Sequence, residues 1–312
     1  MIMHYLFMHI LCIFVLEKLD IAMERTNKID MNRMRCYSSV FSRRVFSDII
    51  NYDDYSHLNA VIDLYDIANK KKAKTYYDIM KYLYKAIAKY YRCEYVYKNE
   101  VINNLLLKKY SKTGTIAINE FRVLDSIVDL AMFNGVSKAF EIKTEYDTKK
   151  RLGHQLETYS RLFKECYLVI PKELLSQYKS CIGQNVGIIV LYTERGRIKL
   201  SEVRSATNNV IDSDVLIHSI RTCEYKNIIK EYFGYLPTVS CYEMFDECKK
   251  MLKEIPSDIL QKLFIAEIKK RKNISGFLND IPLEIRQMCL SLNLTEKQSK
   301  VLDTKLNVQI TM

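Results

Sequence analysis

The middle of the chain holds two short apolar, β-branched runs. They cover residues 126–133 and 138–144, and Asn134-Gly135 lies in the short segment between them. Apolar runs joined by Asn-Gly indicate a β-hairpin. Two further runs, residues 165–170 and 186–192, are continuously apolar, which is typical of strands buried on both faces of a sheet. The pattern therefore predicts a β-sheet in this part of the chain.

Helices and outer strands are predicted around these runs. Residues 98–110 indicate a short helix, residues 115–123 a first strand, residues 148–164 a polar helix and residues 197–203 a last strand. The resulting order is helix, three strands, helix, strand. We therefore expect an α/β fold in which helices flank a mixed sheet.

The regions on either side are predicted to be helical. Within residues 52–98 apolar side chains recur at helical spacing, and the pattern after residue 213 is helical but interrupted by Pro237, Pro256 and Pro282. The last region shows no chemistry and is interpreted as a helical cover or a module that selects a protein partner or substrate. The expected parts are an arm or over-extended start (1–22), a helical N-terminal region (23–97), the core (98–212) and a helical C-terminal region (213–312).

The first sixteen residues are almost wholly apolar. This segment is shorter than the roughly 20 residues that a spanning helix needs. It also lacks a basic leading end and a small-residue cleavage site, so it makes a poor signal peptide. A membrane anchor is the less favoured interpretation of this segment.

Charged and polar residues interrupt the predicted hairpin and the helix after it. Asp129 lies in the first apolar run, and Glu141 and Lys143 lie two apart in the second, so both point to one face of a strand. Gln155 and Tyr159 are four apart, on one face of the predicted polar helix.

The chain resembles the PD-(D/E)XK nuclease superfamily, which has a restriction-endonuclease-like core. The resemblance lies in the order of an Asp on one strand, Glu-x-Lys on the next strand and Gln-x-x-x-Tyr on the following helix. The helix segment is most similar to the branch with RecB-type nuclease domains. Within it, the chain resembles small, largely uncharacterised bacterial and phage proteins that share the runs EIKTE-x-D and RL-x-x-Q-x-x-x-Y. The resemblance covers about residues 95–205. Val128 rather than proline precedes Asp129, a departure that is common in the superfamily.

The resemblance implies hydrolysis of phosphodiester bonds with Mg²⁺ or Mn²⁺ as the cofactor. Asp129 and Glu141 offer the hard oxygen ligands that these ions prefer, and the carbonyl of Ile142 would add another. In the superfamily the helix before the first strand often supplies a further acidic ligand. Glu100 fits that place and Glu94 is its rival, although a glutamate there can equally serve only to offset the helix dipole.

Lys143 would orient or deprotonate the attacking water and stabilise the charge that develops on phosphorus. Its pKa would be lowered by the metal and raised by Glu141, and the net direction stays open. By resemblance, Gln155 would hydrogen-bond around the nucleophile or phosphate, and Tyr159 would contact DNA or brace its helix. The alternative is that Asp129, Glu141 and Lys143 form a salt-bridged seam, although such groups among buried strands are costly without a ligand.

The hairpin geometry decides whether the two carboxylates can share a site. A two-residue loop at Asn134-Gly135 sets Asp129 opposite Phe140, which puts Asp129 and Glu141 on opposite faces. A three-residue loop pairs Phe133 with Ser137 and sets Asp129 opposite Glu141. We therefore predict the three-residue loop or a bulge, despite the usual preference of Asn-Gly for two-residue loops.

Composition adds modest support for a nucleic-acid partner. The formal net charge is +11, which favours a polyanion such as DNA, but an AT-rich coding sequence would also be rich in lysine. Lysines and tyrosines interleave over residues 70–92 and could grip phosphates and bases, although a solvated lysine face is the simpler interpretation. The nine cysteines form no Cys-x-x-Cys pair, which favours a reducing, cytoplasmic location.

The leading hypothesis is a metal-dependent deoxyribonuclease, and the resemblance alone implies that it acts in phage defence or mobile-element biology. The alternative is a catalytically silent module of the same fold that binds nucleic acid or protein. DNA is the expected partner and a membrane is not.

Overall fold

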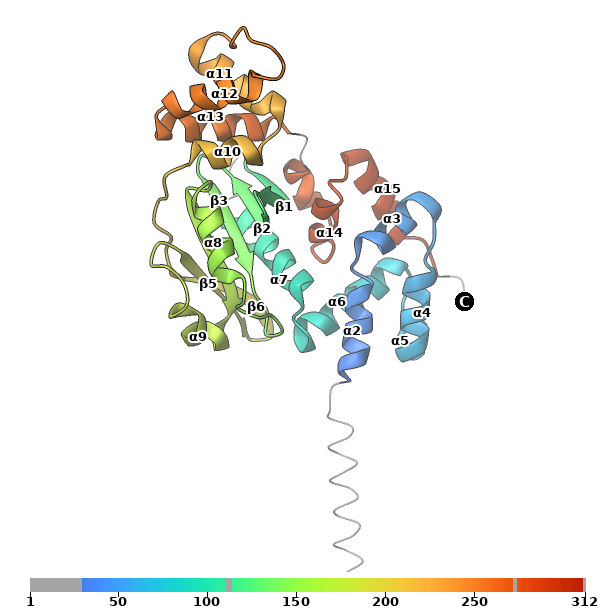
Figure 1. Cartoon of the computed structure of the whole chain (residues 1–312). Coiled ribbons are helices and arrows are strands. Elements are labelled where there is room, and N and C mark those ends of the chain that lie inside the picture. The colour runs from blue at the N-terminus through green and yellow to red at the C-terminus, as the bar shows by residue number, and fades with distance from the viewer. Residues whose placement is uncertain (1–29, 110–113, 272–273, 311–312) are drawn as a thin grey trace, which may run out of the picture.

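A computed structural model describes residues 30–109, 114–271 and 274–310 (Figure 1). The apolar start predicted for residues 1–22 lies outside these ranges. Within them, no helix is long and apolar enough to cross a membrane. The predicted α/β fold is confirmed, with a mixed sheet on one side of the molecule and helices packed around and beside it.

The sheet has six strands in the spatial order β1-β2-β3-β4-β5-β6. The pairs β1/β2, β2/β3 and β5/β6 are antiparallel, whereas β3/β4 and β4/β5 are parallel. The strand bounds, which follow the sequence prediction closely, are β1 Ile116–Val123, β2 Ser126–Phe133, β3 Ser137–Ile142, β4 Glu165–Pro171, β5 Gly187–Glu194 and β6 Arg197–Arg204.

Each parallel pair is joined by a helical crossover, as parallel strands require. Helix α8 (Leu152–Ser160) connects β3 to β4, and it is shorter than the predicted helix over residues 148–164. The short helices η2 (Lys172–Leu174) and α9 (Leu175–Lys179) connect β4 to β5.

The two faces of the sheet belong to two different hydrophobic cores. Ala131 and Phe133 point to one core, and Leu130 and Met132 to the other, because successive side chains on a strand alternate. The first core is closed by α8 and by a group of four helices, α10 Ser213–Ser219, α11 Thr222–Phe233, α12 Met244–Glu254 and α13 Ser257–Lys269.

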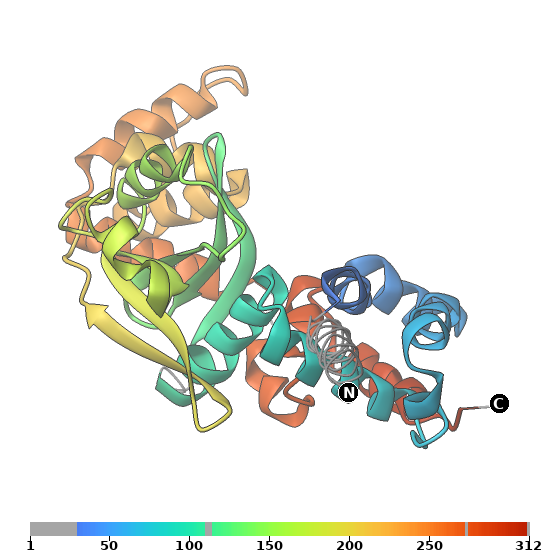
Figure 2. The same ribbon diagram turned by 90° about the horizontal axis from the view of Figure 1, so that it is seen from below.

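The second core extends beyond the sheet. Helix α7 (Glu94–Val101) continues as the wider π-helical segment η1 (Ile102–Lys109), and both cover this face with η3 (Ser275–Asp280) and α14 (Arg286–Ser291). The core then runs on into a helical lobe, seen beside the sheet in Figure 2. That lobe consists of α2 Met31–Ser39, α3 Arg43–Tyr52, α4 Ser56–Tyr65, α5 Ile67–Lys70, α6 Tyr76–Tyr90 and α15 Glu296–Leu306.

The helical regions depart from the expected parts in two ways. The C-terminal region is divided, since α10 to α13 pack on the sheet while α15 packs on α3 and α6 of the helical lobe. The lysine-rich stretch over residues 70–92 is also not one helix. Lys70 ends α5, a turn follows, and α6 begins at Tyr76, capped by Thr75.

The hairpin has the three-residue loop that the chemistry requires. Phe133 pairs with Ser137 and Ala131 with Ala139, and the N–H of Asn134 donates to the carbonyl of Val136 at 3.3 Å. This odd loop confirms the predicted register, which pairs the strands as far as Leu130 and Phe140, the residues next to Asp129 and Glu141.

An irregularity in the β1/β2 pair accompanies this register. The ladder pairs Asn119 with Leu130 and Phe121 with Val128 and passes over Glu120 and Asp129. Glu120 has φ of 56°, which is uncommon for a residue other than glycine. Val128 and Ala131 face the same core although they are three apart, so the strand reverses its facing at Asp129. The β1/β2 register is the same on both sides of this point, and β2 and β3 pair without a shift, so of the two predicted alternatives the hairpin has the odd loop.

Candidate functional site

Four of the predicted site residues form a closed ring of polar contacts. Lys143 Nζ donates to Glu141 Oε1 at 2.7 Å and to Gln155 Oε1 at 3.3 Å. The Tyr159 hydroxyl lies 3.0 Å from Glu141 Oε2, and Gln155 Nε2 lies 3.4 Å from that hydroxyl. Strand β3 and its extension present the glutamate and lysine on one face, and one face of α8 presents the glutamine and tyrosine. The spacing read from the sequence therefore produces the contacts.

Tyr159 fixes the position of Glu141. Its hydroxyl is fully buried and lies 2.6 Å from the carbonyl of Ile127 as well as 3.0 Å from the Glu141 carboxyl. A single hydroxyl hydrogen cannot serve both acceptors. When it is donated to Ile127, the contact with Glu141 is best satisfied by a protonated glutamic acid that donates to the tyrosine oxygen.

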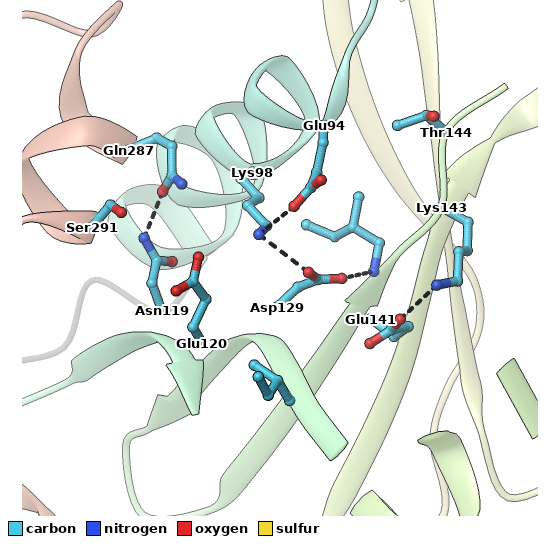
Figure 3. A network of polar contacts seen from close by, with 12 residues as sticks. Glu94, Lys98, Asn119, Glu120, Asp129, Glu141, Lys143, Thr144, Gln287 and Ser291 are labelled. Carbon is cyan, nitrogen blue, oxygen red and sulfur yellow. Dashed lines mark hydrogen bonds and ion pairs between the residues drawn. The ribbon is translucent and has the colours of Figure 1, made fainter. Parts of the chain in front are cut away.

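Asp129 is held on the neighbouring strand by two partners (Figure 3). Its Oδ2 accepts the backbone N–H of Ile142 at 2.8 Å. Its Oδ1 lies 3.1 Å from Nζ of Lys98, and the same ammonium lies 2.5 Å from Glu94 Oε1. The first contact anchors Asp129 to β3, and the second ties it to α7.

Burial and like charge dominate the electrostatics of the two carboxyls. Removal from water and the nearby charge of Asp129 raise the pKa of Glu141 to about 7, although Lys143 opposes the shift. Burial also raises the pKa of Asp129, against the opposing charge of Lys98. Removal from water is the largest cause of both shifts, so the neutral form of each carboxyl is favoured relative to water.

The pKa values of the two lysines are also raised, which favours the charged form of a lysine. Burial alone would lower the pKa of Lys143, but Glu141 and then Asp129 outweigh it and the pKa is raised. The pKa of Lys98 is raised in the same way by Asp129 and Glu94, against the effect of burial. Both side chains are therefore cationic at neutral pH in the metal-free protein.

Glu100 lies outside this arrangement. Its carboxylate accepts hydrogen bonds from the Tyr84 hydroxyl at 2.7 Å and from Asn104 Nδ2 at 2.9 Å, on another face of the helix. Glu94, the rival candidate, is the α7 glutamate on the side of Asp129. Which of the two would face the sheet depends on the rotation of α7 about its axis, and the sequence does not give that rotation.

A cavity of about 440 Å³ opens beside Asp129. Glu141 is only 2% exposed and does not line this cavity. At the edge of the cavity, His154 Nε2 lies 3.0 Å from an oxygen of Asp125, and both side chains are exposed. The lining residues are Glu94, Lys98, Glu120, Asp125, Ser126, Ile127, Asp129, Arg151, His154 and Gln155.

Lys98 is a side chain of this polar network that the sequence did not single out. It stands four residues after Glu94, and such pairs are common on solvated helix faces. Only the tertiary packing of α7 against the sheet shows that its ammonium reaches a strand carboxylate.

The carboxylate oxygens of the site are chemically suited to a hard divalent cation. Mg²⁺ is commonly held by one or two carboxylates together with water and substrate phosphate, and Asp129 and Glu141 provide two. Each of their oxygens already has an internal partner. Among the described residues, no three His, Cys, Asp or Glu side chains converge as a ready metal site.

The fold and the site define an α/β protein with an acidic cavity and a buried carboxylate–lysine network beside the junction of a β-hairpin and parallel strands. The chain belongs to a family described as Bacteriophage P4 protein cII, whose sequence model matches residues 87–292. That span runs from the end of α6 to the end of α14 and includes every candidate site residue.

A curated relative shows the same affiliation. The protein cII of Enterobacteria phage P4 is 23% identical over 170 residues, which cover 53% of this chain and 63% of that relative. The match thus spans less than two thirds of the relative's length. No solved structure matches the chain.

Proposed function

We propose that this protein is a metal-dependent nuclease that hydrolyses phosphodiester bonds in DNA. The observation that carries the proposal is the ring joining Glu141, Lys143, Gln155 and Tyr159, with Asp129 beside it on the next strand. These residues come from three separate elements in the order that resembles the PD-(D/E)XK nucleases. The proposal also includes membership of this chain in the PD-(D/E)XK superfamily, in addition to the phage P4 cII family.

The chain's own residues would divide the work. Asp129 and Glu141 would hold Mg²⁺ or Mn²⁺, which when bound supplies Lewis acidity and lowers the pKa of water. Lys143 is cationic and positioned by Gln155, so it can orient a nucleophilic water and offset charge on a phosphate. Tyr159 holds Glu141 in place from behind.

The energetic cost of the cluster supports a functional role. Glu141 is 2% exposed and the Lys143 side chain 14% exposed, so both charges are largely removed from water. Replacing such buried pairs by apolar residues is often neutral or stabilising. A fold that needed only stability would gain little from two carboxylates and two lysines here.

A second candidate function also has an observation in its favour. Every oxygen of Asp129 and Glu141 is already satisfied by a protein partner, which is what a catalytically silent member of the fold would show. In that case the protein would bind nucleic acid, or a protein partner through its C-terminal helices, without turnover.

Cleavage of linear, circular and single-stranded DNA with Mg²⁺ separates the two candidates. The nuclease proposal expects products with Mg²⁺, none with EDTA, and none from Lys143→Ala. Lys150→Ala, which changes an exposed lysine of the following turn, is the matched control and should keep full activity. Equal cleavage by the Lys143→Ala and wild-type proteins would defeat the assignment. Binding without cleavage by any form would favour the silent module.

A role in phage defence or mobile-element biology belongs to the same proposal. The phage relative gives it context, and the net charge of +11 suits a DNA partner.

A further inference from the structure

Lys98 occupies an unusual position for a helix lysine. Its side chain is only 7% exposed, and its ammonium lies between two carboxylates, 2.5 Å from Glu94 Oε1 and 3.1 Å from Asp129 Oδ1 (Figure 3). The ammonium thus occupies a place where a cation is held by one oxygen from α7 and one from β2.

The contacts of Asp129 show which oxygen could be released. Oδ2 accepts a backbone N–H of β3 at 2.8 Å, from Ile142, and that N–H cannot move without moving the strand. Oδ1 is held by a flexible side chain. Because a lysine side chain can change rotamer while a strand N–H cannot, Oδ1 is the oxygen that withdrawal of Lys98 makes available.

The surroundings also offer Lys98 a second position. The Glu94 side chain is 58% exposed and, like Lys98 and Asp129, lines the cavity. The ammonium can therefore leave Asp129 and turn through the cavity toward solvent, while the Glu94 carboxylate stays at the site. Lys143, by contrast, contacts Glu141 and Gln155 rather than Asp129.

We propose that Lys98 is an internal cation that competes with the divalent metal ion for Asp129 and so sets the metal affinity of the site. This inference rests on the proposed function. In the metal-free protein the ammonium neutralises Asp129. Metal binding requires Lys98 to withdraw, and removal of Lys98 makes the site bind metal more tightly.

Charge balance gives the physical reason for the exchange. With all their carboxyls ionised, Glu94, Asp129 and Glu141 carry three negative charges, and Lys98 and Lys143 carry two positive ones, which leaves one negative charge. A divalent ion added to this set would leave one positive charge in a largely buried site. Withdrawal of Lys98 into solvent restores neutrality, which a poorly solvated site favours.

The first test measures metal affinity directly. Mn²⁺ is titrated calorimetrically into the full chain as wild type and as Lys98→Met, Lys98→Arg and Asp129→Asn. Lys98→Met keeps the length of the side chain without its charge and should lower the Kd by about tenfold or more. Lys98→Arg keeps the charge and should not tighten binding. Asp129→Asn should abolish it.

The second test uses the wild-type chain and needs no variant to fold. Lysines are acetylated with a limiting reagent, with and without Mn²⁺, and the extent at Lys98 is read by mass spectrometry. Labelling at Lys98 should rise several-fold when Mn²⁺ is present, because the amine leaves its buried pair. The exposed Lys150 is the internal control and should not change.

The outcomes separate this inference from the proposed function. Two results would refute the competition and leave the nuclease proposal standing, provided that Asp129→Asn loses the metal. One is that Lys98→Met binds Mn²⁺ with the same Kd as the wild type. The other is that labelling at Lys98 is unchanged by Mn²⁺. If neither the wild-type nor the Lys98→Met chain binds Mn²⁺, both ideas fall together.

Discussion

The pH dependence of stability should report the buried carboxyl of Glu141. Its pKa is raised from 4.5 to about 7 by burial and by the charge of Asp129. The folded chain therefore holds a proton that the unfolded chain has already lost between these two values. By linkage, the free energy of unfolding falls as pH rises through this window, and no further contribution is lost above about pH 7.

The size of the effect follows from the shift. Each pKa unit corresponds to about 1.36 kcal/mol, so the free energy of unfolding of the metal-free protein should fall by roughly 3 kcal/mol between pH 4.5 and pH 7 through this group alone. Glu141→Gln keeps the shape of the side chain and cannot ionise. Its stability should lack this fall, so the variant should be more stable than the wild type at pH 8 and similar to it near pH 4.5.

Urea unfolding in EDTA, followed by circular dichroism at several pH values, measures this difference. Asp129→Asn provides a second check, because loss of its negative charge should move the fall to lower pH. Parallel curves for the wild type and Glu141→Gln across the whole range would show that Glu141 ionises normally and would refute the reasoning.

Three further predictions concern other charges. Lys143→Met leaves Glu141 buried without its 2.7 Å partner and should lower the free energy of unfolding by about 3 kcal/mol at pH 8. Adding Glu141→Gln in the same chain should restore most of this loss. If the effects of the two substitutions are additive, the coupling is contradicted. Burial alone would raise the pKa of Asp66, but Tyr37, Tyr82 and a guanidinium lower it below the ordinary value of 3.8. Asp66→Asn should therefore destabilise the protein at pH 7, and this deficit should shrink as the pH falls below 3.8, because the wild type then loses the contribution. A pH-independent deficit in thermal melts would oppose it. The last concerns the lysines of the α5–α6 turn, which are Lys71, Lys72 and Lys74. Their replacement by Gln should weaken DNA binding and flatten its salt dependence, and an unchanged salt slope in fluorescence anisotropy would assign them to a solvated surface.

The strands could be predicted from the sequence almost to the residue, and the reason is local. Apolar runs, turn residues and the charged positions of the hairpin are each recognised from a few neighbouring residues. The loop length was predicted from the requirement that Asp129 and Glu141 share one site. The same local spacing placed Gln155 and Tyr159 on one face of α8, where the structure has them.

The remaining features depend on how elements pack, and no local pattern records that. The rotation of α7 against the sheet brings Glu94 and Lys98 to Asp129 and turns Glu100 toward Tyr84. The left-handed backbone at Glu120 has no glycine to mark it. The division of the C-terminal helices between two cores follows from shape, since both groups have ordinary amphipathic sequences.

The position of α15 has a consequence for the order in which the chain can fold. The Tyr55 hydroxyl donates to the carbonyl of Lys305 at 2.9 Å, and Lys305 Nζ donates to the carbonyl of Ile50 at the same distance. Contacts between residues so distant in sequence form slowly, because a long chain must first be brought together. During synthesis the sheet and α10 to α13 are complete while α3 still lacks the helix that covers it. Helix α3, made early among the described helices, thus reaches its final packing only after α15 is made.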